Sequence, residues 1–265
     1  MTQRTFVIAE CCSAWRFGED HLKNAFRMIE AAHKVGADAA KFQWCSDPVE
    51  MSKRRNDNEP KNYEILSYPF EWLLNLKAKC DSVGIEFMVT AFIEKDIPTI
   101  APLVKRFKVA SAESSDQAFV KAHFKFDKPL LVSYAFGSWK YGYWDEESGI
   151  DYNERISELL CVCAYPTPVD SANLKRIVGK FDGLSDHTTS TLTGALAVAA
   201  GATIVEVHAK LDETPQDNPD YPHSRNISQL TEYVRNIRIA EVAMGDGENR
   251  MMPCEEKNTV RRVNG

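Results

Sequence analysis

The sequence repeats one structural unit along almost its whole length: a short run of apolar and β-branched residues, followed by an amphipathic stretch with helical spacing. Such runs are typical of buried strands, and such stretches are typical of helices that cover them. The predicted strands are residues 5–9, 37–42, 85–89, 106–110, 129–132, 159–164, 181–184 and 203–207. The predicted helices are about 20–35, 68–83, 95–104, 115–122, 152–158, 170–179, 190–200 and 227–243.

This alternation predicts the fold class. Regular exchange of strand and helix favours a parallel sheet, and eight units in 265 residues fit an α/β chain folded as a single-domain (β/α)8 TIM barrel. The alternative is an open, doubly wound sheet, which carries a glycine-rich phosphate loop after its first strand. Residues 10–15 (ECCSAW) contain no glycine, so the barrel is favoured. We predict a catalytic barrel over residues 1–245 and a C-terminal tail over residues 246–265.

Composition limits the partners that such a barrel can have. A net charge of −6 argues against a general surface for nucleic acid or anionic membranes. The N-terminus has no apolar signal core, and no stretch approaches the ~20 apolar residues of a membrane span. Seven cysteines, an odd number, fit reduced thiols better than a disulfide framework. We therefore expect a cytoplasmic protein that acts on small molecules, with no nucleic acid and no membrane partner.

Every predicted strand ends in a polar or ionisable residue, and in a TIM barrel these ends converge on the face where active sites form. His187 and His208 follow the last two strands, so both imidazoles could reach one cation. A lone histidine there would indicate a structural residue, whereas a pair on neighbouring strands favours a metal site. Imidazole ligands favour Mn, Fe, Co or Zn over Mg or Ca. The strand-end residues are Glu10, Lys41, Gln43, Thr90, Lys108, Ser111, Glu113, Ser133, Tyr165, Ser185, His187, Glu206 and His208.

Lys41 and Lys108 lie inside otherwise apolar strands, where an ammonium group is costly to bury unless it meets an anion. One interpretation is an ion pair with Glu10, Glu113 or Glu206. The other is a phosphate or carboxylate ligand, with added hydroxyl donors from Thr90, Ser111, Ser133 and Ser185. Glu10 also has two interpretations: a base beside a metal-bound water, or the ion-pair partner of Lys41.

These segments resemble the sialic acid synthase (N-acetylneuraminate synthase) family over essentially the whole chain. The histidine motif FDGLSDHT at 181–188 follows the AYPTP motif by about 20 residues, and a second histidine follows the last strand. The other matching segments, in family order, are VIAE at 7–10, GADAAKFQ at 36–43, GIEFMVTAF at 84–92, KVASAES at 108–114, AYPTP at 164–168 and GATIVEVHAKLD at 201–212.

The resemblance implies a synthase that condenses phosphoenolpyruvate with an N-acetylated hexosamine such as N-acetylmannosamine, giving a nonulosonic acid and phosphate. It implies a Mn-type cation on His187 and His208, with Mg, Co or Zn as alternatives, and a homodimer as the common assembly of relatives. It assigns phosphoenolpyruvate to Lys41, Thr90, Lys108, Ser111, Ser133 and Ser185. It assigns the sugar to Gln43, Glu113, Tyr165 and Asp220, and catalysis to Glu10, Tyr165, His187 and His208.

The sequence also departs from the family pattern. CCSAWRFG replaces an NHNG-like loop after the first strand, and Cys163 stands where asparagine is common. The tail resembles the linker to an antifreeze-like domain, which we expect to be missing. These departures leave an alternative function, a non-catalytic or altered-specificity barrel that binds phosphoenolpyruvate or sugar as an assembly module.

Three segments have less specific interpretations. Residues 134–149 contain six aromatics, which predict either a packed lid or dimer contact, or a platform for a sugar. Residues 53–55 (KRR) are interpreted as a solvated loop. Cys161 and Cys163, two apart on one strand face, are interpreted as core thiols.

Overall fold

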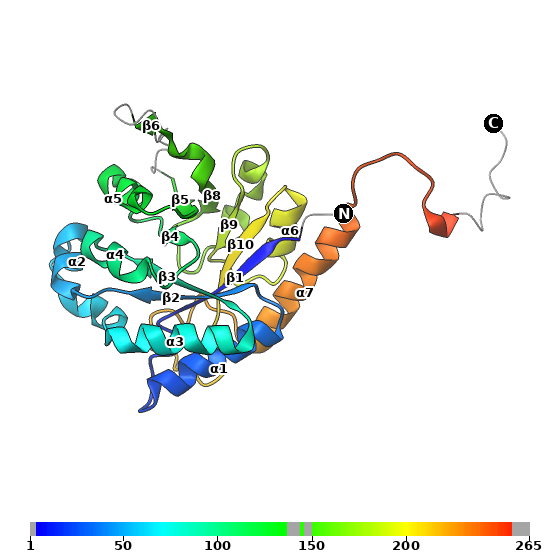
Figure 1. Ribbon diagram of the computed structural model, residues 1–265. Helices are drawn as coiled ribbons and strands as arrows, with labels where there is room; N and C mark the ends of the chain where they lie inside the picture. The colour runs from blue at the N-terminus through cyan, green and yellow to red at the C-terminus, as the bar shows by residue number, and fades with distance from the viewer. Residues whose placement is uncertain (1–3, 137–143, 146–149, 256–265) are drawn as a thin grey trace, which may run out of the picture.

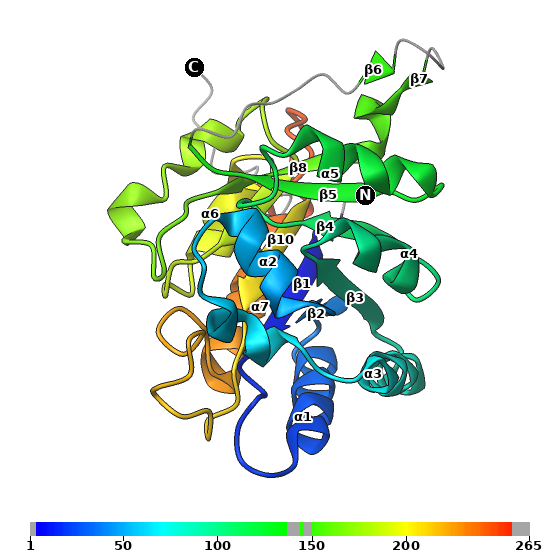
Figure 2. The same ribbon diagram turned by 90° about the vertical axis from the view of Figure 1, so that its left-hand side faces the viewer.

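The computed structural model describes residues 4–136, 144–145 and 150–255. Eight parallel strands form a nearly closed barrel with helices between them, which confirms the predicted TIM barrel (Figures 1 and 2). Their hydrogen-bonded order is β3-β2-β1-β10-β9-β8-β5-β4, and β3 lies in contact with β4 at the seam. The strands are β1 (Phe6–Cys12), β2 (Ala39–Trp44), β3 (Glu86–Ala91), β4 (Phe107–Val109), β5 (Leu130–Tyr134), β8 (Ile156–Cys161), β9 (Gly183–Asp186) and β10 (Ile204–His208).

The helices that cover the barrel differ in length. The α-helices are α1 (His21–Lys34), α2 (Pro48–Arg55), α3 (Phe70–Val83), α4 (Ile97–Ile100), α5 (Gln117–Ala122), α6 (Thr193–Ala199) and α7 (Ile227–Met244). Short 3-10 turns are η1 (Pro60–Leu66), η2 (Glu94–Asp96), η3 (His123–Lys125), η4 (Tyr152–Arg155), η5 (Val169–Ser171) and η6 (Leu174–Ile177). Two short strands, β6 (Trp144–Asp145) and β7 (Ile150–Asp151), form a separate antiparallel pair.

Two of the predicted helices are wrong, and one helix was missed. The helix expected at 152–158 is the turn η4 followed by β8, because residues from Ile156 onward pair with β5. The helix expected at 170–179 is the two turns η5 and η6, separated by Asn173 in the left-handed conformation (φ 46°). The helix α2 was not predicted, although Asp47 caps it through Val49 N and Glu50 N and Pro48 opens it.

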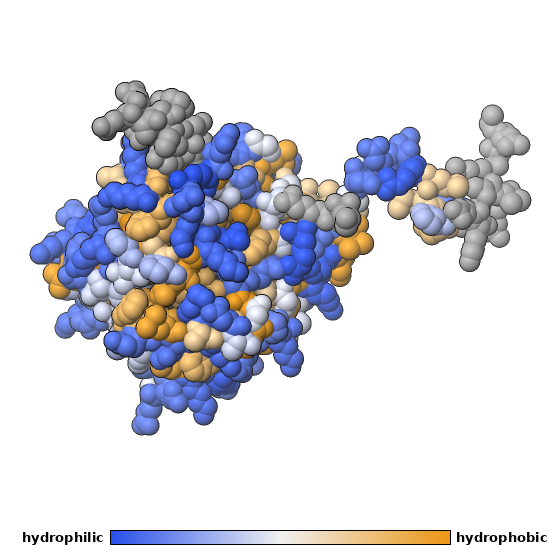
Figure 3. All heavy atoms as spheres, in the orientation of Figure 1, coloured by the Kyte–Doolittle hydropathy of each residue, from blue (hydrophilic) through white to orange (hydrophobic). Residues whose placement is uncertain are grey.

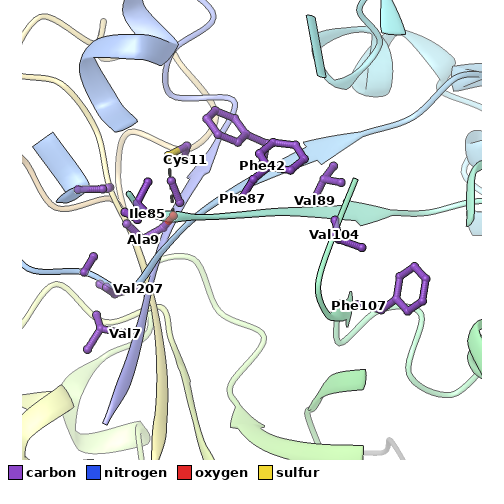
Figure 4. Packing of buried hydrophobic residues seen from close by; sticks show 14 of the residues in the cluster. Val7, Ala9, Cys11, Phe42, Ile85, Phe87, Val89, Val104, Phe107 and Val207 are labelled. Carbon is purple, nitrogen blue, oxygen red and sulfur yellow. Dashed lines mark hydrogen bonds between the residues drawn. The ribbon is translucent and has the colours of Figure 1, made fainter. Parts of the chain in front are cut away.

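Alternation along the strands builds the floor of the site. Inside the barrel, Ile8, Ala39, Met88, Leu131 and Leu159 pack into one apolar cluster. Side chains two residues apart share a strand face, so the next inward layer above this floor is polar. That layer contains Glu10, Lys41, Thr90 and Ser133, together with Cys161. Residues on the opposite strand faces, such as Phe42, Phe87 and Val89, pack beneath the helices (Figure 4).

Hydrophilic and hydrophobic residues are interspersed on the face shown in Figure 3. After α7 the chain runs outward from the barrel (Figure 1), and the division at residue 245 stays a prediction. No helix in the described part of the chain is long and apolar enough to cross a membrane.

The aromatic segment 134–149 lies largely in 137–143 and 146–149, outside the described residues, so both interpretations of it stay predictions.

Candidate active site

A pocket of about 300 Å³ opens at the C-terminal ends of the barrel strands. This volume is at the lower end of the range of small-molecule sites. The polar layer above the apolar floor forms its base, and the loops after the strands form its walls. The predicted site residues that line it are Glu10, Lys41, Gln43, Lys108, Ser111, Ser133, Tyr165, Ser185, His187, His208 and Asp220. Thr90 and Glu113 lie behind this lining.

Lys41 is held by carboxylates in this structure. Strand register places Glu10 beside Lys41 on β2, and the two side chains form a buried ion pair. The Lys41 ammonium group also lies 3.5 Å from Glu206 Oε2 and donates to Thr90 Oγ1 at 3.1 Å. Burial by itself lowers the pKa of Lys41, but the two carboxylates raise it well above its ordinary value. Lys41 is therefore ion-paired in this structure, and its assignment to phosphoenolpyruvate stays a prediction.

Lys108 is less well compensated. Its ammonium group donates to Ser133 Oγ at 2.8 Å and to Val109 O at 2.9 Å, both of them neutral oxygens. The carboxylate of Glu206 lies 3.7 Å away and accepts a hydrogen bond from Ser185 Oγ at 2.8 Å. Burial lowers the pKa of Lys108. A further anion in the pocket would stabilise this charged group.

Both predicted metal-binding histidines are buried and close together. Their ring centroids are 5.3 Å apart. His187 Nδ1 lies 2.9 Å from Val162 O, and because a carbonyl only accepts, Nδ1 carries the proton and Nε2 keeps its lone pair. Burial lowers the pKa of His187 and of His208, so both are neutral, the form that binds metals. The assignment of a cation to this pair stays a prediction.

The residues around His208 fit a divalent cation. One ligand atom each from Cys12, His208 and Asp220 lies within 4.8 Å of the other two, and all three residues are buried. His208 Nδ1 is 3.9 Å from Asp220 Oδ1 and, among the described residues, has no hydrogen-bond partner. An unpaired imidazole nitrogen beside a carboxylate is a donor set suited to a transition metal. Sequence analysis identified His208 and Asp220 but missed Cys12.

His223 was also missed. It is 4% exposed, and neither ring nitrogen makes a hydrogen bond within the described part of the chain. Its Nε2 lies 3.3 Å from Asp220 Oδ1, and its ring centroid is 4.5 Å from that of His208. The segment between Asp220 and α7 has no regular secondary structure, so no periodic signal pointed to this position.

Arg55 brings a third cation to the pocket. The interpretation of residues 53–55 as a loop is wrong, because all three belong to α2. Arg55 is the last residue of α2, where Asn56 ends the helix in the left-handed conformation. Its guanidinium group lines the pocket, pairs with Glu113 at 2.6 Å and lies 5.5 Å from the Phe92 ring. Glu113, predicted as a sugar contact, is thus tied to Arg55.

Tyr165 and Cys163 form the rim. Tyr165 is 51% exposed, and its ring lies 4.2 Å from that of His187. Cys163 is exposed, so the interpretation as a core thiol is wrong for it and holds for Cys161 alone. A hydrogen bond with Cys161 lowers the pKa of Cys163 to about 6, and its Sγ lies 3.0 Å from Ser111 Oγ.

Comparisons with known proteins show which proteins this chain resembles. The chain is 32% identical to the pseudaminic acid synthase of Campylobacter jejuni, over 98% of this chain and 80% of that protein. It is 31% identical to the N,N'-diacetyllegionaminic acid synthase of Legionella pneumophila, over 97% of this chain and 78% of that protein. The crystal structure of N-acetylneuraminic acid (sialic acid) synthetase from Leptospira borgpetersenii in complex with citrate has the same fold, with a TM-score of 0.82 at 24% identity. That superposition covers 99% of this chain and 94% of the other.

A family assignment follows from these matches. Residues 28–249 match the sequence model of the NeuB family, which is most of the chain. The resemblance to sialic acid synthases that the strand-end motifs predicted is therefore confirmed. This chain belongs to the NeuB family.

Proposed function

We propose that this protein condenses phosphoenolpyruvate with an N-acetylated amino sugar of the N-acetylmannosamine type, giving a sialic-acid-type nonulosonic acid and phosphate. Membership of the NeuB family and the names of its relatives, which are sugar acid synthases, support the reaction class. Within the site, the observation that carries the proposal is Lys108. This ammonium group is 3% exposed, hydrogen-bonded to neutral oxygens, and located at the base of a pocket that could admit a small anion.

In this proposal phosphoenolpyruvate, the donor substrate, lies over the polar layer of the barrel. Lys108 donates to one anionic group of phosphoenolpyruvate. Lys41 keeps its ion pair with Glu10 and turns a further N–H from Glu206 to the other anionic group, since a doubly anionic ligand needs charge-assisted hydrogen bonds. The hydroxyl groups of Ser111, Ser133 and Ser185 complete its hydrogen bonding, and Thr90 positions Lys41. The acceptor sugar lies nearer the rim, against Gln43, Tyr165 and Asp220.

The chemistry then forms one carbon–carbon bond and, from water, one carbon–oxygen bond, and it breaks the carbon–oxygen bond to phosphate; the aldehyde oxygen takes a proton and becomes a hydroxyl group. A divalent cation on His187 and His208, which we propose is Mn²⁺, with Mg²⁺, Co²⁺ or Zn²⁺ as alternatives, would polarise the aldehyde of the open-chain sugar. C3 of phosphoenolpyruvate bonds to the aldehyde carbon, water adds at C2, and phosphate leaves from C2. Burial raises the pKa of Glu10 above its ordinary value, so its carboxylate suits the task of accepting the proton of that water.

A direct assay tests the reaction. The purified protein is incubated with phosphoenolpyruvate, Mn²⁺ and, in turn, N-acetylmannosamine, its 6-phosphate and a diacetamido sugar. We expect metal-dependent release of phosphate with one of these sugars, and a matching nine-carbon acid by mass spectrometry. Binding of phosphoenolpyruvate without release for any sugar would instead support the non-catalytic binding module.

Variants of the two histidines test the metal assignment. His187→Ala and His208→Ala should each reduce metal-dependent phosphate release by at least about 100-fold, because each removes a ligand or its support. Circular dichroism should show both variants folded. His33→Ala, at an exposed position on α1, is the control and should keep full activity. Wild-type turnover in either pocket variant would show that the metal assignment is wrong.

A further inference from the structure

The Cys12 sulfur atom lies at the proposed cation site, and the assignment of the cation to His187 and His208 does not use it. This inference rests on the proposed function for the presence of a cation at the barrel mouth. Cys12 Sγ, a ring nitrogen of His208 and a carboxylate oxygen of Asp220 lie within 4.8 Å of one another. The three residues come from the end of β1, the end of β10 and the loop before α7, so only the closed barrel brings them together.

The backbone at the end of β1 places Cys12 in the pocket. Cys12 has a left-handed backbone (φ 36°), and the pairing of β1 with β2 shifts register between Glu10 and Cys12. The Cys12 N–H donates to Glu10 Oε1 at 2.7 Å, which fixes this turn. A cysteine rarely adopts this conformation unless the surrounding structure holds it there. The thiol lines the pocket.

The neighbouring cysteine points elsewhere. Cys11 Sγ lies 3.8 Å from Ala9 O and packs in the hydrophobic cluster between the sheet and the helices (Figure 4). Two adjacent thiols of the same strand therefore have different surroundings: Cys12 faces polar ligand atoms, and Cys11 faces only the core. Cys11 supplies a matched control for any experiment on Cys12.

The distances suit a shared cation. With metal–ligand bonds of about 2.0–2.3 Å, two ligand atoms on one tetrahedral ion lie about 3.5 Å apart. Ligand atoms that lie up to 4.8 Å apart therefore reach this tetrahedral separation if each of them moves inward by less than about 1 Å.

Unpaired polar atoms point to the same ligand independently. His208 Nδ1 and both ring nitrogens of His223 are buried without a hydrogen-bond partner among the described residues, beside the carboxylate of Asp220. Buried polar atoms are nearly always paired in folded proteins, so a cluster of unpaired imidazole nitrogens indicates a group that binds between them.

We propose that Cys12 coordinates, as a thiolate, the cation that the proposed function assigns to His187 and His208, and that Asp220 is a further ligand of this cation beside His208. The thiol proton leaves to solvent when the cation binds. A thiolate ligand favours Zn²⁺ and Co²⁺ over Mn²⁺ more strongly than a site of nitrogen and oxygen ligands does. The protein therefore discriminates between these ions through Cys12.

Cobalt titration of this chain tests this assignment. The wild type, Cys12→Ser and Cys11→Ala are titrated with Co²⁺ and followed by near-ultraviolet absorption and calorimetry, and Mn²⁺ is titrated in parallel. We expect a thiolate-to-cobalt charge-transfer band in the wild type and in Cys11→Ala, and no band in Cys12→Ser. The affinity of Cys12→Ser for Co²⁺ should fall by at least about 10-fold, with a smaller change for Mn²⁺. Thermal unfolding checks that the variants fold, and Cys12→Ala replaces the serine variant if it does not.

Each outcome decides the question. A wild-type cobalt complex without the band overturns the assignment, as does a band that survives the loss of Cys12 or a failure of Co²⁺ to bind stoichiometrically. Product formation with Mn²⁺, measured on the same preparations, separates this inference from the proposed reaction. If product forms but the charge-transfer band is missing, Cys12 is not a ligand and the proposed reaction stands. If the band appears but no sugar gives product, Cys12 is a ligand and the proposed reaction is wrong.

Discussion

Glu206→Gln is the substitution whose effect follows most directly from the charge arrangement of the pocket. Glu206 is 4% exposed and lies 3.5 Å from the ammonium group of Lys41 and 3.7 Å from that of Lys108. Glutamine has the same shape and can still accept the hydrogen bond from Ser185. The substitution therefore removes one buried negative charge and little else, and leaves Lys108 without its carboxylate neighbour.

The size of the effect can be obtained in two ways. Burial raises the pKa of Glu206, but Lys108 and Lys41 overcome this and lower it from 4.5 to about 2. At about 1.36 kcal/mol per pKa unit, the folded state stabilises the ionised carboxylate by about 3 kcal/mol. Because the pKa is depressed, this stability is present at neutral pH and disappears as the pH falls from about 4.5 through about 2. Breaking a buried ion pair costs about 3–5 kcal/mol, in agreement.

Urea unfolding at neutral pH measures this loss. We expect Glu206→Gln to lower the free energy of unfolding by about 3–5 kcal/mol, which leaves a typical domain folded. In a double-mutant cycle with Lys108→Met, the combined variant should be less destabilised than the sum of the single ones, because no unpaired ammonium group remains. Inorganic phosphate should raise the melting temperature of Glu206→Gln more than that of the wild type, since it supplies the missing anion.

The control is an ion pair on the surface. Glu213 pairs with Arg27 at 2.5 Å with both side chains about half exposed, so Glu213→Gln should cost less than about 1 kcal/mol. A loss below about 1 kcal/mol for Glu206→Gln, or strictly additive effects in the cycle with Lys108, would refute the reasoning.

Two further predictions concern the rim and the helix layer. Cys163 should react with iodoacetamide with a midpoint near pH 6, because a hydrogen bond with Cys161 lowers its pKa to about 6 and only the thiolate reacts. Mass spectrometry across the neutral range locates the midpoint, and an alkaline one would contradict the prediction. Gly194→Ala should lower the free energy of unfolding by about 1–3 kcal/mol, since a new Cβ would lie 2.5 Å from the Tyr233 ring. Leu196→Ala, at a position 54% exposed on the same helix, should change it by less than about 0.5 kcal/mol, and equal losses would exclude the steric explanation.

The barrel and most of the site could be predicted from the sequence because both depend on local periodicity. Alternating side chains along a strand decide which residues face inward, and parallel strands bring their C-terminal ends to one face. The strand pattern therefore suffices to place Lys41, Lys108 and the two histidines in one pocket. The prediction from local periodicity failed at residues 152–158, where the spacing is helical but residues from Ile156 onward pair with β5 as a strand.

The sequence alone thus determined the fold class, the family and the residues at the strand ends. Only the tertiary structure decided which charges pair, that Arg55 reaches the pocket from α2, and that Cys12 and His223 lie beside His208 and Asp220. The physical reason for the charges is that strand register brings more than one carboxylate near Lys41, and only side-chain packing decides which of them pair. For Cys12, Arg55 and His223 the reason is that they lie at an irregular strand end, at the end of a missed helix and in a loop. None of these segments has a repeating pattern, so their positions follow from the closure of the barrel and the packing of its loops.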